Sequence, residues 1–202
     1  MTRSSQHTRE RILQAAHRLF RKVGFFRAGV EEIAIASGVT KRTLYHHFES
    51  KDALLTAVLS ARDDDIFAVP NPYGVDLKGE PHELVDRLFN KLVEWAGTPH
   101  WGGSGFTRLA VELADLPGHP ARAVARRHKA RMESYLSQVF GAAGVPGPAA
   151  FARELALLLE GAMVMILLHG DPSYASVAAA AAKRSLDARG RQATRASRRV
   201  AA

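Results

Sequence analysis

The chain has 202 residues, of which 47% are hydrophobic and 24% are charged, a composition typical of one or two small globular domains. It contains no cysteine, which excludes a disulfide framework, a thiolate zinc site and a cysteine nucleophile. Its 28 Lys and Arg residues against 20 Asp and Glu give a net charge of +8, so nucleic acid or an anionic surface is a plausible partner.

The positive charge is concentrated at the two ends of the chain. Residues 1–60 hold 10 basic and 5 acidic side chains and residues 182–202 hold 7 and 1, whereas residues 61–181 hold 11 and 14. A basic head that binds an anion, followed by a body with another role, is the simplest arrangement. The start of the chain is polar, which predicts no secretory signal, and residues 155–168 are too few to cross a bilayer. We therefore expect a cytoplasmic protein without a membrane span.

Apolar residues recur at helical spacing along almost the whole chain and no alternating strand pattern appears, so we predict an all-α fold of about nine helices. Gly24 is expected to end the first helix, and Thr40 and Ser50 to cap the third and fourth. Asp63 and the two aspartates after it oppose the helix dipole, so fraying is expected there. The first four predicted helices are 12–23, 30–37, 40–48 and 51–67.

Proline and glycine divide the rest of the chain. Residues 68–80 contain two of each and are interpreted as a linker, and further breaks follow at similar clusters. Residues 188–202 contain five arginines and few apolar residues, so we predict a disordered tail. The helices predicted between these breaks are 81–96, 106–115, 120–141, 149–169 and 173–187.

Residues 30–48 have the pattern of a helix-turn-helix, in which two short helices pack nearly perpendicular across a tight turn. Small Ala34 allows close approach, and Gly38 supplies the turn without a Cβ clash. Val39 and Leu44 are expected to form the core of the pair. Basic, hydroxyl and aromatic side chains then remain on the second helix, where they can read base edges and grip phosphates. These side chains are Lys41, Arg42, Thr43, Tyr45, His46 and His47.

The segment 43–54 resembles the T-L-Y-x-H-F-x-x-K-x-x-L signature of the TetR family of transcriptional regulators. The preceding Phe20, Gly24, Ile33 and Gly38 also fall where that family has them. The resemblance implies a homodimer whose two heads enter successive major grooves of a roughly palindromic operator in double-stranded DNA.

The resemblance also implies roles for individual residues of the head. Tyr45, His47 and Lys51 correspond to phosphate contacts, whereas Lys41, Arg42, Thr43 and His46 are placed to meet bases. The chain departs from the family at residues 28–29, Ala-Gly, where Ser or Thr is usual, so a phosphate contact there would use backbone N–H groups. A metal site at His46 and His47 is disfavoured, because adjacent residues do not share a helix face.

For the body, the resemblance implies that the fifth to eighth helices enclose a ligand cavity and that ligand binding changes the spacing of the heads. Aromatic and methionine side chains suit an apolar or aromatic small molecule, although such residues are more often core. His100, His119 and His128 could orient a polar group, but loop or surface roles are expected for each. The predicted ligand contacts are Phe89, Trp95, Trp101, Phe106, Met132, Tyr135 and Met163.

The eighth and ninth helices are predicted to form the dimer interface. Residues 155–168 are apolar almost all round, and residues 178–182 offer a surface of small side chains. Two helices from each chain could form a four-helix bundle across a two-fold axis. The eighth helix could equally be the central core helix of each protomer, and both roles can hold at once.

The leading hypothesis is a ligand-responsive, dimeric DNA-binding repressor without cofactor, metal or catalytic residues, although activators also occur in the family. It divides the chain into a helix-turn-helix domain (1–50), a connecting helix (51–67), a ligand-binding and dimerisation domain (68–187) and the tail (188–202).

Two alternatives belong to other classes. An α-helical enzyme acting on a small apolar substrate could use Glu112 and Asp115 as a carboxylate pair, although a helix surface explains them as well and no catalytic motif is present. A nonspecific binder of the nucleoid or of a membrane surface would use the arginines of the tail.

Overall fold

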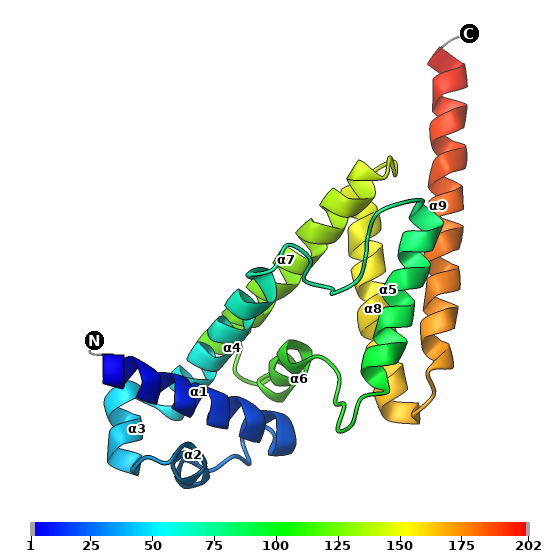
Figure 1. Cartoon of the computed structure of the whole chain (residues 1–202). Helices are drawn as coiled ribbons and strands as arrows, with labels where there is room; N and C mark the ends of the chain where they lie inside the picture. Colours follow the sequence, from blue (N-terminus) through cyan, green and yellow to red (C-terminus); the bar gives the residue numbers. More distant parts are fainter. Residues whose placement is uncertain (1–2, 201–202) are drawn as a thin grey trace. The chain divides into compact units, whose positions relative to one another are not determined.

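The computed structural model describes residues 3–200, and the regular secondary structure of this part of the chain is all α-helix, as predicted (Figure 1). The first helix begins before the apolar pattern that predicted it, and the sixth ends at Glu112 rather than near residue 115. The nine helices in the described residues are α1 (Arg3–Val23), α2 (Val30–Ser37), α3 (Lys41–His47), α4 (Lys51–Phe67), α5 (Pro81–Ala96), α6 (Gly105–Glu112), α7 (Pro120–Ala142), α8 (Pro148–His169) and α9 (Ser173–Val200).

The prediction of a disordered tail is wrong for residues 188–200, which continue α9, while residues 201–202 lie outside the described part. The few apolar residues of the segment suggested disorder, but its alanine, arginine and glutamine residues have a high helix propensity. The start of this extension is also held by contacts. Arg189 donates to the Glu154 carboxylate (Nη2 to Oε2, 3.1 Å) and lies 5.6 Å over the ring of Phe151.

The chain divides into two compact units. Unit 1 comprises the residues up to 70 together with 104–128, and unit 2 comprises 71–103 and the residues from 129 onward. The sequence placed residues 104–128 in the second domain, whereas the structure groups them with the head. The physical reason is apolar burial, since Phe106, Leu109 and Leu113 belong to the core of unit 1.

The core of unit 1 supports the two short helices α2 and α3. Helix α1 packs against α2 and α4, and α2 packs against α3. Ile12, Ile33, Leu44 and Leu55, one from each of α1 to α4, are all fully buried in one cluster. Burial of a single large side chain contributes about 1.5–3 kcal/mol, which compensates for the weak intrinsic stability of short helices.

In unit 2, helices α5, α8 and α9 run side by side (Figure 1). Phe140 and Phe151 meet edge to face, with ring centroids 4.8 Å apart, and both are completely buried. Ala175, Ala178 and Ala182 form the buried stripe of α9, and their small size permits its close approach. No helix in the described residues has an apolar run that could span a membrane.

The aromatic pair predicts a large effect on stability. Phe140→Ala should lower the free energy of unfolding by about 3–5 kcal/mol, because it removes buried area and leaves a cavity against Phe151. Gln138→Ala, at an exposed position of the same helix, should change it by less than about 0.5 kcal/mol. Urea unfolding followed by circular dichroism, at one protein concentration, measures both values. Equal effects of the two substitutions would contradict the packing described.

Candidate DNA-binding surface

The turn between α2 and α3 has the geometry that the sequence predicts. Gly38 adopts a left-handed conformation (φ 64°, ψ 37°), which suits a residue without Cβ. The N–H of Val39 donates to the carbonyl of Ala34 at 3.0 Å, closing the end of α2. Leu44 is fully buried, so its burial fixes which face of α3 points outward.

Arg11, which sequence reasoning missed, supports this turn from α1. Its Nη2 atom donates to the carbonyl oxygens of Ser37 and Gly38, the latter at 3.1 Å. A Cβ at residue 38 would lie 2.5 Å from the same guanidinium, so a larger residue there would also displace the end of the Arg11 side chain. Arg11 is separated from Ser37 by 26 positions and from Gly38 by 27, so no local pattern in the sequence predicts these contacts.

Both predicted N-caps are confirmed. Thr40 Oγ1 accepts the backbone N–H of Thr43 at 3.1 Å and lies 2.8 Å from the Thr43 hydroxyl. Ser50 Oγ accepts the N–H of Ala53 at 3.0 Å at the start of α4. Each cap satisfies a donor that the first turn of a helix leaves unpaired. The caps therefore fix where α3 begins and where α4 begins after it.

Six of the seven predicted DNA contacts lie on α3, away from Leu44. Arg42, Tyr45 and His46 are exposed, and Thr43 and His47 are half-buried. The rings of His46 and His47 meet edge to face at 5.7 Å. Among the described residues, the structure gives Arg42 no hydrogen-bond or ion-pair partner. This face therefore offers a guanidinium, a phenol and an imidazole to the outside.

Lys41 and Lys51 are engaged within the protein. Lys41 Nζ lies 3.4 Å from Glu31 Oε1, and both side chains are largely exposed, so this ion pair contributes about 0–1 kcal/mol. Lys51 Nζ donates to the carbonyl of Phe26 (3.2 Å) and sits 4.6 Å from the centroid of the Phe25 ring. Burial lowers the pKa of Lys51, while the nearby carboxylates of Asp52 and Glu112 act in the opposite direction.

The departure from the family pattern at residue 29 also has a structural consequence. Gly29 is the N-cap of α2, and its N–H donates to Glu32 Oε2 at 3.0 Å. That backbone donor is thus already paired within the protein. A phosphate approaching this helix end would also meet the carboxylates of Glu31 and Glu32 in the first turn.

The predicted ligand contacts do not gather into one site. In unit 2, Trp95 and Trp101 meet edge to face at 5.7 Å, and Tyr135 stacks on Tyr73 at 6.0 Å. The Trp101 Nε1 atom is buried and has no hydrogen-bond partner among the described residues. Met132 and Met163 are half-buried in the same unit. Phe106 belongs instead to the core of unit 1.

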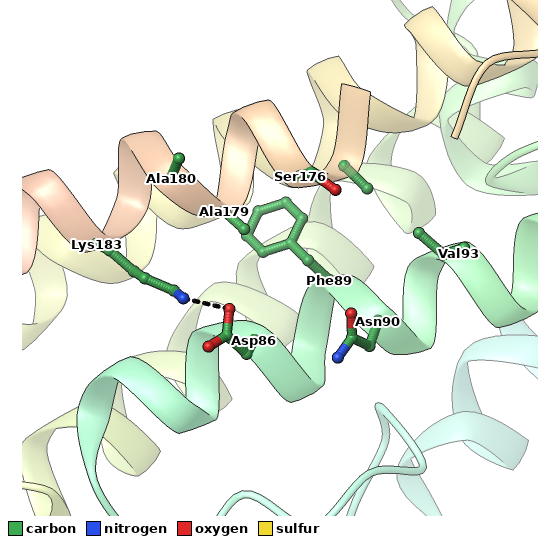
Figure 2. Close-up of a pocket in the computed structure, with 9 residues that line it drawn as sticks. Asp86, Phe89, Asn90, Val93, Ser176, Ala179, Ala180 and Lys183 are labelled. Atoms are coloured by element: carbon green, nitrogen blue, oxygen red, sulfur yellow. Dashed lines mark ion pairs between the residues drawn. The ribbon is translucent and has the colours of Figure 1, made fainter. Parts of the chain in front are cut away.

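A groove of about 280 Å³ lies between α5 and α9 (Figure 2). Phe89 is the predicted ligand contact that lines it, and Figure 2 shows its ring between the two helices. An ion pair between Asp86 and Lys183 crosses the groove. Ser176 and Asn90 add polar groups, while alanines of α9 form part of the wall. The groove is therefore amphipathic rather than an apolar ligand cavity.

His119 lies in the loop before α7, as expected, although its side chain is buried. His128 is buried within α7, so the expectation of a loop or surface role is wrong for it. His128 Nδ1 lies 2.9 Å from Oδ1 of the fully buried Asp63, and its ring stacks on Phe106 with centroids 3.7 Å apart. Asp63 is therefore a buried partner within α4 and not the start of a frayed end. Arg127 Nε lies 3.6 Å from the other carboxylate oxygen. No group of His, Asp and Glu in the described residues could hold a metal ion.

The short capped helix, the glycine turn and the exposed face of α3 define the class of helix-turn-helix proteins. Residues 12–58 match the family described as bacterial regulatory proteins, tetR family. The transcriptional regulator UidR of Escherichia coli is 42% identical over 59 residues, and TtgR of Pseudomonas putida is 36% identical over 93. These matches cover 30% and 44% of the two relatives' lengths, respectively, so the chain matches less than half of either protein.

Solved structures extend the likeness to nearly the whole chain. A TetR-type transcriptional regulator from Streptomyces avermitilis is 31% identical, with a TM-score of 0.71, over 87% of this chain and 98% of that one. A TetR-family regulator from Streptomyces coelicolor is 25% identical, with a TM-score of 0.73, over 91% and 96%. The chain belongs to the TetR family of transcriptional regulators.

The cap of α3 generates a prediction. Thr40→Ala should lower the free energy of unfolding by about 1 kcal/mol, because the N–H of Thr43 loses its acceptor. Thr40→Ser keeps the hydroxyl and should stay close to the parent protein. Urea denaturation of the three proteins provides the comparison. If serine were as destabilising as alanine, the cap would not be the cause.

Proposed function

We propose that the protein is a dimeric, ligand-responsive repressor that binds a roughly palindromic operator through α3. The observation that carries this proposal is the outward face of α3, where Arg42 has no partner in the described residues and Tyr45 and His46 are exposed. Membership in a family of transcriptional regulators supports it, as does the excess of basic residues in the first 60 positions. Because its partner is DNA, we infer that the protein acts in the cytoplasm.

Each residue of the surface has a proposed role. Arg42, Lys41, Thr43 and His46 meet base edges, and a bidentate contact of Arg42 or Lys41 with guanine is the commonest specific contact in the major groove. Tyr45, His47 and Lys51 contact phosphates, which fix the register of the head on the duplex. Lys41 and Lys51 must share their donors with Glu31 and the Phe26 carbonyl, or give up those partners, to do so.

Helices α8 and α9 form the proposed dimer interface. Leu157 and Leu168 on α8 are 71% and 70% exposed, and Val164 between them is 42% exposed. Their spacing of seven and eleven residues places them on one face of the helix. Val177 on α9 is 65% exposed. A contiguous exposed apolar face of this kind supports burial against a second copy.

The proposed effector is an apolar or aromatic small molecule that carries a hydrogen-bond acceptor. The stacked tyrosines 73 and 135 and the Trp95–Trp101 pair supply aromatic surface in unit 2. The buried Nε1–H of Trp101 is a donor that such an acceptor would satisfy. Phe106 is left out of this proposal, because its ring is stacked on His128 within unit 1.

The enzyme alternative loses its candidate pair. Glu112 is engaged by two backbone N–H groups of the α1–α2 turn and is not paired with Asp115. A carboxylate committed to backbone donors is poorly suited to general acid–base work.

Selection of bound DNA from a random pool by the purified full-length protein tests the proposal. We expect one palindromic sequence, bound by two protomers, with an affinity that falls steeply with salt because phosphate contacts release counterions. Equal binding of all sequences would refute a sequence-specific regulator and would favour nonspecific binding through the basic C-terminal segment.

Substitutions in the selected complex separate base contacts from phosphate contacts. Arg42→Ala should cost about 1–3 kcal/mol at one operator position and remove the base preference there. Lys51→Ala should weaken all sequences equally and reduce the slope of log affinity against log salt by about 1. Fluorescence anisotropy on single-base variants of the operator measures both. The same response from the two variants would show that this division of roles is incorrect.

A further inference from the structure

The carboxylate of Glu112, the last residue of α6, is bound to the turn between α1 and α2. Its Oε2 accepts the N–H of Phe25 at 3.0 Å, and its Oε1 accepts the N–H of Phe26 at 2.8 Å. The two oxygens thus accept hydrogen bonds from two successive N–H groups, which lie 87 and 86 residues before Glu112 in the sequence. Charge-assisted bonds of this kind are roughly twice as strong as neutral ones.

The same turn is also held by α4. Lys51 donates to the Phe26 carbonyl at 3.2 Å and covers the Phe25 ring. The turn is therefore held by a carboxylate at two of its N–H groups and by an ammonium at one of its C=O groups. Gly24 adopts φ +87°, and a Cβ there would lie only 3.1 Å from Glu112 Oε1, so the glycine leaves room for the carboxylate.

A second polar contact joins α6 to the end of α1. Arg108 Nη1 donates to the carbonyl of Arg21 at 3.3 Å, near the C-terminus of α1, where carbonyls lack partners within the helix. Residues 108 and 112 are four apart, so they share one face of α6. This face of α6 thus holds the end of α1 and the turn that follows it.

We propose that Glu112 is a positioning residue for DNA binding, which sets the orientation of the helix-turn-helix on α6. This inference rests on the proposed function. The apolar residues Phe106, Leu109 and Leu113 already keep α6 in the core of unit 1, but apolar packing is not directional. Two hydrogen bonds to successive N–H groups are directional and resist rotation of the turn.

The consequence concerns the spacing between the two halves of the operator. A dimer with fixed heads matches one separation of half-sites, because the major grooves it enters are one helical turn apart. A head that can rotate on α6 reads the same bases but tolerates other separations. Glu112 therefore contributes to spacing selectivity and not to base preference.

The test compares Glu112→Gln with Asp115→Asn in the full-length protein. Both remove one negative charge, but Asp115 is exposed and the structure gives it no hydrogen bond or ion pair among the described residues. Affinities are measured for the selected operator, for operators with a base pair added to or removed from the spacer, and for operators with one changed base. We expect E112Q to retain its base preference while its discrimination between spacings falls about fivefold or more, the effect of one lost charged hydrogen bond. D115N should match the parent protein.

Failure of the proposed role of Glu112 and failure of the proposed repressor function give different results. Unchanged spacing selectivity in E112Q would overturn the inference and leave the repressor assignment intact. A loss of affinity that is uniform over all operators and proportional to the unfolded fraction would also overturn it, by showing a structural role only. If the parent protein selected no sequence, the proposed function itself would fail.

A second variant and a second measurement test the same role of Glu112 if E112Q folds poorly. Glu112→Asp keeps the charge but shortens the side chain, so it reaches only one N–H, and we expect an intermediate loss of spacing selectivity. Amide hydrogen exchange reports the contact directly, since protection should fall at one or both of the Phe25 and Phe26 amides in each variant. Parent-like selectivity in E112D with faster exchange at both amides would refute the positioning role.

Discussion

A seven-residue helix does not form on its own in water, and α3, which carries most of the proposed DNA contacts, is such a helix. It persists because Leu44 is buried in a core that α1, α2 and α4 share, and because Thr40 caps its first turn. Because Leu44 holds one face of α3 in the core, the opposite face of the helix is exposed. Recognition of DNA by this helix therefore depends on the packing of Leu44.

The orientation of the head depends on polar contacts with residues 104–128. Asp63 is fully buried, and a buried carboxylate is tolerated only when it is paired and hydrogen-bonded. His128 and Arg127 meet that requirement and thereby bind α4 to α7. Glu112 does the same between α6 and the α1–α2 turn. These contacts are directional, so they fix angles that the apolar core alone leaves free.

The features that were predicted correctly depend on residues close together in sequence. Helical periodicity, the caps at Thr40 and Ser50 and the left-handed Gly38 all follow from local chemistry. The contacts of Glu112 with the α1–α2 turn and of Asp63 with His128 could not be predicted, because each pair is 65 or more residues apart. Their side chains were interpreted as a helix surface, a frayed end and an exposed histidine.

The prediction of a single set of ligand contacts and that of a disordered tail failed because they were based on residue type alone, without knowledge of where the residues lie in the fold. Aromatic side chains were selected as ligand contacts by their chemistry, yet an aromatic ring serves a core equally well, as Phe106 does in unit 1. The tail from residue 188 was judged by its few apolar residues, although helix propensity and the Arg189–Glu154 contact favour the continuation of α9. The composition of a segment shows how much apolar surface it can bury, but not which residues elsewhere in the fold will contact it.

Part of the positive charge of the head is engaged within the protein. Lys41 is paired with Glu31, and Lys51 donates to the Phe26 carbonyl, so both ammonium groups already have a contact inside the protein. A phosphate must share these groups with their present partners or replace those partners, so the net gain is smaller than a count of basic side chains implies. Arg42 has no protein partner to give up among the described residues, so its contact with a base replaces only bonds to water. The guanidinium that reads a base is thus better placed to contribute free energy than the ammonium groups that position the backbone.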